Sequence, residues 1–282
     1  MSGPSPRALT QRDFDRFAAL SGDHNPIHTD PAFARGSALG ATVAQAMLLY
    51  GLLDAALSRR LTARLPRGWL PIAQTLVFPA PTFVGDAVAA DASPLGTPLS
   101  FGTRLRNQHG ATTVDGEARV GDALDGYPVR AIDDSFAHGD LESDAELLGL
   151  TLGQSATTAR RFTERDVDDY LDLSGDRNPI VAEATAAAAL GLPGRVLPGP
   201  LLTALLQDLL GMRLPGRGSG WLRQRLAFHS PAHAGEPLTA SVTVTRLRRA
   251  KQIANLACVI SSDDGRTVAT GEALVLVRNL ER

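Results

Sequence analysis

Cysteine, aromatic residues, long apolar runs and an excess of charge of either sign are all scarce in this chain. Its 282 residues include a single cysteine, and aromatic residues make up 5%. One cysteine excludes an intramolecular disulfide and a metal site built from several cysteines. The 28 basic and 30 acidic side chains leave a net charge of −2, so no basic excess indicates nucleic-acid binding. No apolar run reaches the roughly 18 residues that a membrane span needs.

The start of the chain also lacks the pattern of a targeting signal. Met1-Ser2-Gly3-Pro4 does not begin the basic-then-apolar layout of a signal peptide. Together with the lack of a predicted span, this indicates a cytoplasmic protein. Cys258 lies in an apolar run over residues 253–260, which predicts a packed strand residue and not a nucleophile.

An internal repeat is the main feature that the sequence does contain. Residues 21–28 read SGDHNPIH, and residues 174–181 read SGDRNPIV, 153 positions later. Trp69 and Trp221 continue the match in the same order along both halves. Matches that keep their order indicate a duplicated unit.

The duplication divides the chain into two predicted domains. We expect residues 1–120 to form the first domain, which keeps the full motif, and residues 151–282 to form the second, whose motif is degenerate. The interval 121–150 is rich in acidic residues and poor in large apolar ones. We predict that it is a solvated linker, long enough to bring the second domain alongside the first.

Each copy predicts the same order of helices and strands. A short helix with a threonine cap is followed by a long apolar helix and then by alternating, β-rich stretches. These segments fall at about 10–20, 41–59 and 88–92 in the first copy, and at about 163–173, 199–212 and 241–245 in the second. One buried helix followed by antiparallel strands indicates an α+β unit, with the sheet wrapped around the helix.

Asp23 and His28 form the constellation that could carry chemistry. Asn25 and Pro26 lie between them and favour a turn. A turn can hold a carboxylate and an imidazole close together, and such a pair suits proton transfer near neutral pH. The alternative is that these side chains only stabilise the turn. The second copy argues against it, because that copy keeps the turn residues but has Val181 in place of the histidine.

The motif resembles that of a known family. The pattern SGDxNPIHxD over residues 21–30, the apolar helix after it and FVGD at 83–86 are similar to the MaoC-like (R)-specific enoyl-CoA hydratases. The resemblance implies a tandem, or double, hotdog fold that forms an internal pseudo-dimer and leaves a homodimer of the chain open. It also implies an acyl-CoA or acyl-carrier-protein thioester as substrate, and no metal or redox cofactor.

Several residue roles follow from this resemblance. Asp23 and His28 are expected to be catalytic, adding water at C3 and moving a proton at C2 of the thioester. Asn25 is expected to orient them and to be one of the substrate-binding residues. Substrate binding falls to the start of the long helix, at Gln45, Ala46 and Met47, where backbone N–H groups would meet the thioester carbonyl. The family usually has His-Gly where this chain has Gln45-Ala46, which leaves this carbonyl site open to question.

Asp54 is the last candidate substrate-binding residue. It interrupts the apolar helix of the first copy, and Gln207 holds the matching position in the second. The resemblance places a small polar group there, near the catalytic pair, so we expect Asp54 to face Asp23 and to raise one of the two pKa values. The alternative is that Asp54 points to solvent.

Three other functions stay open. The Gln45-Ala46 departure is compatible with a dehydratase for a bulky polyketide or steroid acyl chain. Together with the degenerate second copy, it is also compatible with a non-catalytic protein that binds acyl thioesters. A thioesterase is a further alternative, because one fold hosts several activities.

Overall fold

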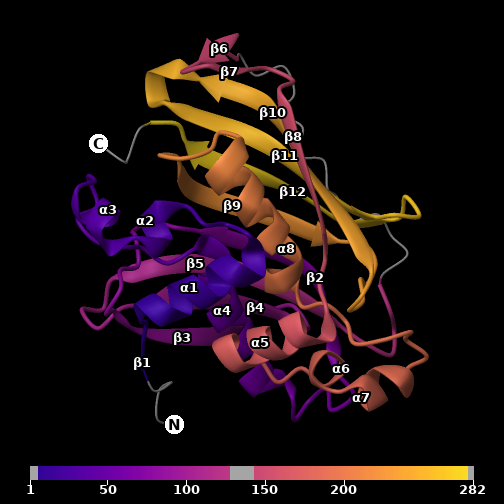
Figure 1. The fold of residues 1–282 in the computed structure, drawn as a ribbon. Helices are drawn as coiled ribbons and strands as arrows, with labels where there is room; N and C mark the ends of the chain where they lie inside the picture. The colour runs from indigo at the N-terminus through magenta and orange to yellow at the C-terminus, as the bar shows by residue number, and fades with distance from the viewer. Residues whose placement is uncertain (1–5, 128–142, 279–282) are drawn as a thin grey trace.

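The computed structural model describes residues 6–127 and 143–278, which form two similar α+β units (Figure 1). The first unit contains β1 (Arg7–Ala8), α1 (Gln11–Ser21), α2 (Pro26–Thr29), α3 (Pro31–Arg35), α4 (Ala46–Leu61), β2 (Trp69–Val77), β3 (Ala87–Pro94), β4 (Ser100–Arg106) and β5 (Thr112–Asp122). Its short helices therefore precede a long helix and then a run of strands, as the sequence predicts.

The second unit repeats this order. It contains β8 (Ser155–Arg161), α5 (Glu164–Ser174), α6 (Pro179–Ala182), α7 (Ala184–Ala188), α8 (Gly199–Asp208), the π-helical turn η1 (Leu209–Arg213), β9 (Gly220–Phe228), β10 (Pro237–Arg248), the 3-10 turn η2 (Arg249–Lys251), β11 (Ile253–Ser262) and β12 (Thr267–Leu276). Two short strands precede it: β6 (Glu146–Leu147) lies within the predicted linker, and β7 (Leu150–Thr151) lies at the predicted boundary between the linker and the second domain. Residues 128–142 of that linker lie outside the described residues.

One antiparallel sheet runs through both units. Its strand order is β1-β3-β4-β5-β2-β9-β12-β11-β10-β8. Read outward from the centre, the two halves have the same order of equivalent strands, so the units are related by an approximate two-fold axis. β2 and β9 join the halves, with Thr75 opposite Arg225.

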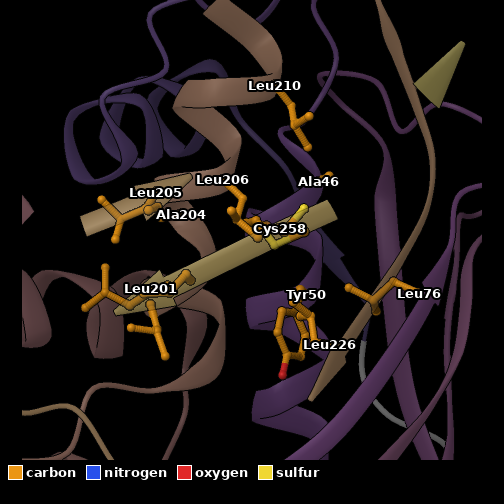
Figure 2. Close-up of a cluster of buried hydrophobic side chains, with 14 of the residues drawn as sticks. Ala46, Tyr50, Leu76, Leu201, Ala204, Leu205, Leu206, Leu210, Leu226 and Cys258 are labelled. Atoms are coloured by element: carbon orange, nitrogen blue, oxygen red, sulfur yellow. The ribbon is translucent and has the colours of Figure 1, made fainter. Parts of the chain in front are cut away.

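The long helices α4 and α8 lie on the same face of this sheet and pack against each other (Figure 1). α4 is buried on nearly all sides, which explains why its sequence is apolar all round. In Figure 2, Tyr50 of α4, Leu201 and Leu206 of α8 and Cys258 of β11 belong to one apolar cluster. The two units therefore share a core, and Cys258 is a packed strand residue as predicted.

Each long helix also packs on a short helix of the other unit. α1 contacts α8, and α4 contacts α5. On the α4 side the contact is close, because a Cβ added to Gly51 would lie 3.3 Å from the ring of Tyr170. The motif turn that follows each short helix consequently faces the long helix of the opposite unit.

Local signals explain where the helices begin and end. Thr10 and Asp13 form a capping box at the start of α1, and Gly22 ends the helix with φ 83°, a conformation that glycine adopts without strain. The first long helix begins at residue 46 and not at 41, because Val43 forms a bridge with Phe83 instead. No helix within 6–127 or 143–278 is long and apolar enough to cross a membrane.

Candidate functional site

The motif turn is built by local hydrogen bonds that its residue types predict. The backbone N–H of Asp23 donates to Ser21 Oγ at 3.1 Å, and that of Asn25 donates to Asp23 Oδ1 at 3.1 Å. Asn25 Oδ1 then accepts from the N–H of Ile27 at 3.2 Å and caps α2. Pro26 suits the first position of this helix, because it has no N–H to leave unpaired. One turn of helix therefore carries His28 back toward Asp23.

Asp23 and His28 come together as predicted. His28 Nε2 lies 3.5 Å from Asp23 Oδ2, and His28 Nδ1 lies 2.7 Å from the carbonyl oxygen of Val43. A carbonyl oxygen can only accept, so Nδ1 carries a hydrogen and Nε2 is the nitrogen that can exchange a proton. The Val43 carbonyl thereby fixes both the ring orientation and the tautomer of the histidine.

Gln207 of α8 completes this pair from the opposite unit. Its Nε2 donates to Asp23 Oδ2 at 2.9 Å, and its Oε1 accepts from the backbone N–H of Met47 at 3.3 Å. One amide thus links the carboxylate of the motif turn to the start of α4. Asn25 reaches the same unit, since its Nδ2 donates to the carbonyl of Gly211 at 3.2 Å.

A cavity of about 290 Å³ lies between the two units beside this cluster. His28 lines it, whereas Asp23 is fully buried and does not. Both units contribute apolar walls: Ile27, Leu39, Val43, Ala44, Ala46, Leu49 and Phe78 from the first, and Leu210, Trp221, Leu222, Val275 and Leu276 from the second. Such a chamber, apolar with a few polar groups at one point, suits an acyl chain with a reactive head.

The predicted substrate-binding residues divide into two groups. Asn25 and Ala46 line the cavity. Gln45 and Met47 do not line it with their side chains, because Gln45 Nε2 donates to the carbonyl of Phe14 at 2.9 Å and Met47 is fully buried. A role for either residue is therefore limited to its backbone.

The placement expected for Asp54 is wrong. Asp54 lies beside Asp176 of the second unit, not beside Asp23, and Gln207 occupies the place next to Asp23. The reason is the crossed packing of the long helices, which turns each one toward the motif of the other unit. The repeat pairs Gln207 with Asp54 in sequence, but this match does not show which of the two lies beside Asp23.

The second unit contains the equivalent of this site in a closed form. Its cavity is about 10 Å³ and is lined by Asp54, Asn178 and Val181 among others, a volume close to that of one water molecule. Burial, together with the nearby carboxylate of Asp176, raises the pKa of Asp54 well above its usual range. With Val181 in place of the histidine and two carboxyl groups side by side, this region has lost the arrangement found around Asp23.

The fold and the larger cavity together define a class of protein, a tandem hotdog with a ligand chamber between its units.

The chain belongs to the MaoC-like domain family, which matches residues 2–115 and 150–264. The (R)-specific enoyl-CoA hydratase of Aeromonas caviae is 40% identical over 126 residues, which cover 45% of this chain and 94% of that protein. The 3-hydroxybutyryl-CoA dehydratase of Methylorubrum extorquens is 33% identical over 132 residues, which cover 47% of this chain and 83% of that protein.

Solved structures of similar architecture extend over both units. A MaoC-like dehydratase superposes with a TM-score of 0.73 at 15% identity, covering 97% of this chain and 96% of the other. A conserved hypothetical protein of Mycobacterium tuberculosis with a double hotdog fold gives a TM-score of 0.69 at 13% identity, covering 98% and 96%. At these identities the likeness concerns the fold alone, and it confirms the predicted tandem hotdog.

Proposed function

We propose that this chain catalyses the reversible hydration of 2-enoyl thioesters to (R)-3-hydroxyacyl thioesters. The observation that carries the proposal is the meeting of Asp23 and His28 beside a chamber that both units line, with His28 in its wall. The family match and the relatives named as enoyl-CoA hydratase and 3-hydroxybutyryl-CoA dehydratase support it. The chain is then a hydro-lyase.

The chemistry requires a proton to be removed from water and another to be delivered to carbon. His28 Nε2 and Asp23 Oδ2 face each other at 3.5 Å, so the two atoms can share one proton or bind one water molecule. As the water oxygen bonds to C3, the pair takes up one proton and C2 receives one, so the pair ends with the protons it began with. Base and acid are not assigned separately, because two interacting groups titrate as a pair.

The start of α4 would stabilise the thioester carbonyl, which gains negative charge during the reaction. Ala46 lines the chamber, and helix N-termini present N–H groups that favour such charge. The Met47 N–H is engaged by Gln207, which leaves that of Ala46 as the proposed donor. The alanine methyl does not prevent this role, because Ala46 lies in regular helix and needs no positive φ.

The reaction needs no metal or redox cofactor, since water is its only co-reactant. The acyl group can arrive on CoA or on an acyl carrier protein. Assembly of the chain into a homodimer and a cytoplasmic location stay predictions.

The size of the chamber bears on the acyl group. Ligand sites span roughly 300–1,000 Å³, and a chamber of about 290 Å³ lies at the lower end of that range. This favours a short or medium linear acyl chain over a steroid or polyketide chain. A panel of enoyl-CoAs of increasing length should therefore show the highest kcat/KM for the shorter members.

The test is turnover of crotonyl-CoA, followed by the loss of enoyl absorbance. We expect Asp23→Asn and His28→Ala each to lower kcat by about 10²–10⁴, the usual contribution of proton transfer by a positioned side chain. His24→Ala, an exposed histidine in the same turn, should leave kcat within about twofold. Full activity in both site variants would refute the proposal. Release of free thiol by the wild type would indicate a thioesterase, and binding without any turnover would indicate a non-catalytic binder.

A further inference from the structure

The backbone of the second unit approaches Asp23 at Gly211, in the π-helical turn after α8. A Cβ added to Gly211 would lie 3.0 Å from both Oδ1 and Oδ2 of Asp23. It would also lie 3.2 Å from Cγ of Asp23, so it would meet the whole carboxylate group. Gly211 is not among the described glycines with positive φ, so its conformation does not require glycine. The requirement at this position is one of space.

The carbonyl of Gly211 also accepts a hydrogen bond from the first unit. In a regular helix this carbonyl would accept from the N–H of residue 215, but Pro215 has none. The turn opens instead, with Leu214 N donating to the carbonyl of Leu209 at 2.8 Å. The carbonyl of Gly211 accepts the Asn25 side chain at 3.2 Å. A proline four residues downstream therefore exposes the group that holds the motif turn.

Ser58 occupies the position in the closed site that Gly211 occupies beside Asp23, and it shows the effect of a side chain there. Ser58 of α4 lies four residues after Asp54, as Gly211 lies four residues after Gln207. Ser58 Oγ donates to Asp176 Oδ1 and accepts from the backbone N–H of Arg177, the latter at 2.7 Å. One carboxylate oxygen of Asp176 is thereby engaged by a hydroxyl.

The helix backbone around Ser58 also differs from that around Gly211. α4 stays regular there, with the N–H of Thr62 donating to the carbonyl of Ser58 at 3.1 Å. That carbonyl is engaged within its own helix, and Asn178 Nδ2 donates to the carbonyl of Trp69 instead, at 2.8 Å. The two sites thus differ both in the side chain over the carboxylate and in the partner of the asparagine.

We propose that Gly211 is a positioning residue of the active site. Its missing side chain lets the carboxylate of Asp23 lie against the helix backbone while Oδ2 faces His28. A side chain at 211 displaces that carboxylate or engages it, as Ser58 engages Asp176. The effect of Gly211 on the rate rests on the proposed function. The contact between residue 211 and Asp23 can be tested by measurements of stability alone.

The kinetic test compares Gly211→Ala with Ser58→Ala, the matched change in the closed site. A Cβ at 3.0 Å requires the Asp23 carboxylate to move by a few tenths of an ångström. Because a misplacement of about 1 Å can cost about 10²-fold in rate, we expect Gly211→Ala to lower kcat by about 3- to 10-fold. Gly211 lines the chamber, but the nearest neighbours of a Cβ there all belong to Asp23, so KM for crotonyl-CoA should stay within about threefold. Ser58→Ala should leave kcat within about twofold. Wild-type kcat in Gly211→Ala overturns the proposal.

Gly211→Ser adds a readout that a structural defect would not produce. A hydroxyl that donates to a carboxylate favours its ionised form. The acidic limb of the kcat/KM profile should therefore move to lower pH in Gly211→Ser relative to Gly211→Ala. Identical pH profiles in the two variants would show that residue 211 does not reach Asp23.

The stability test compares Gly211→Ala in the presence and in the absence of the Asp23 carboxylate. In the wild-type background, Gly211→Ala should lower Tm, because the new methyl meets Asp23. In an Asp23→Ala background the same change should be neutral or raise Tm, since alanine is the better helix former. An equal loss of Tm in both backgrounds overturns the proposal. If Gly211→Ala alone does not fold, recovery of a folded protein in the double variant supports it, and no recovery overturns it.

These readouts separate the two claims. If Asp23→Asn keeps full activity, the proposed function fails, and the Tm comparison still decides whether Gly211 and Asp23 are in contact. If Asp23→Asn is inactive while Gly211→Ala is fully active, the function stands and the role of Gly211 falls.

Discussion

Replacing Gln207 by leucine tests whether the second unit takes part in the chemistry of the first. The side chain is 4% exposed and bonds both Asp23 and the N–H of Met47. Leucine has a similar volume but cannot make either bond. A hydrogen bond to a charged group contributes about 1.5–3 kcal/mol. If this contribution is lost from the transition state, kcat/KM should fall by about 10- to 150-fold, since each 1.36 kcal/mol is a factor of ten.

The pH dependence gives the direction of the effect. Gln207 donates to Asp23 Oδ2, and losing a donor disfavours the ionised carboxylate. The acidic limb of the kcat/KM profile should therefore move to higher pH in Gln207→Leu. The assay is hydration of crotonyl-CoA between about pH 5 and 9, the range that brackets histidine titration.

A control on the same helix separates this role from damage to α8. Thr203 lies one turn earlier and is fully buried. Its hydroxyl donates to the carbonyl of Gly199 at 2.8 Å and lies 3.0 Å from Sδ of Met47, so neither of these partners is Asp23. Thr203→Val should lower stability but leave the pH profile unchanged. If Gln207→Leu keeps both the rate and the profile of the wild type, the link between the units is not functional and our reasoning about the crossed helices fails.

Three further predictions concern the closed site, a helix cap and the chamber. Asp54→Asn should raise Tm at pH 8, and this gain should disappear toward pH 4. The reason is that the pKa of Asp54 is raised in the native state, so ionisation of Asp54 destabilises that state as pH rises through the raised pKa. A gain in Tm that does not depend on pH would contradict this prediction. Thr10→Ala should lower the free energy of unfolding by about 1 kcal/mol in urea, and so should Thr163→Ala, the matching change in the second unit. If neither change lowers it, the capping boxes do not stabilise the motif helices. Leu210→Ala should raise kcat/KM for longer enoyl-CoAs relative to crotonyl-CoA, because this side chain forms part of the chamber wall; an unchanged length preference would exclude it from the acyl path.

The parts of the structure that depend on neighbouring residues could be predicted from the sequence. The capped helix and the turn at Asn25-Pro26 arise from hydrogen bonds over a few residues. This turn brings Asp23 near His28, and the more distant carbonyl of Val43 then orients the histidine ring. The predicted start of α4 is five residues too early, because Ala41, Val43 and Ala44 extend the apolar pattern ahead of the helix. A long-range bridge from Val43 to Phe83 keeps this stretch extended, and hydrophobic pattern alone does not reveal such a bridge.

The contacts between the units could not be predicted with the same reasoning. A sequence shows which face of a helix is apolar, but not which copy of a repeat that face meets. Asp54 and Gln207 illustrate the consequence, since each lies next to the motif aspartate of the other unit. Only the crossed packing of α1 on α8 and of α4 on α5 settles that assignment.

This crossing also explains the pattern in which the duplicated sites diverged. The site at Asp23 combines the motif turn of the first unit with Gln207 and Gly211 of the second. The closed site combines the motif turn of the second unit with Asp54 and Ser58 of the first. The degenerate part of the chain is therefore not one copy of the repeat but one site shared by both. It follows that restoring a histidine at position 181 alone would not create a second active site, because the helix that faces that position belongs to the first unit and carries the residues of a closed site.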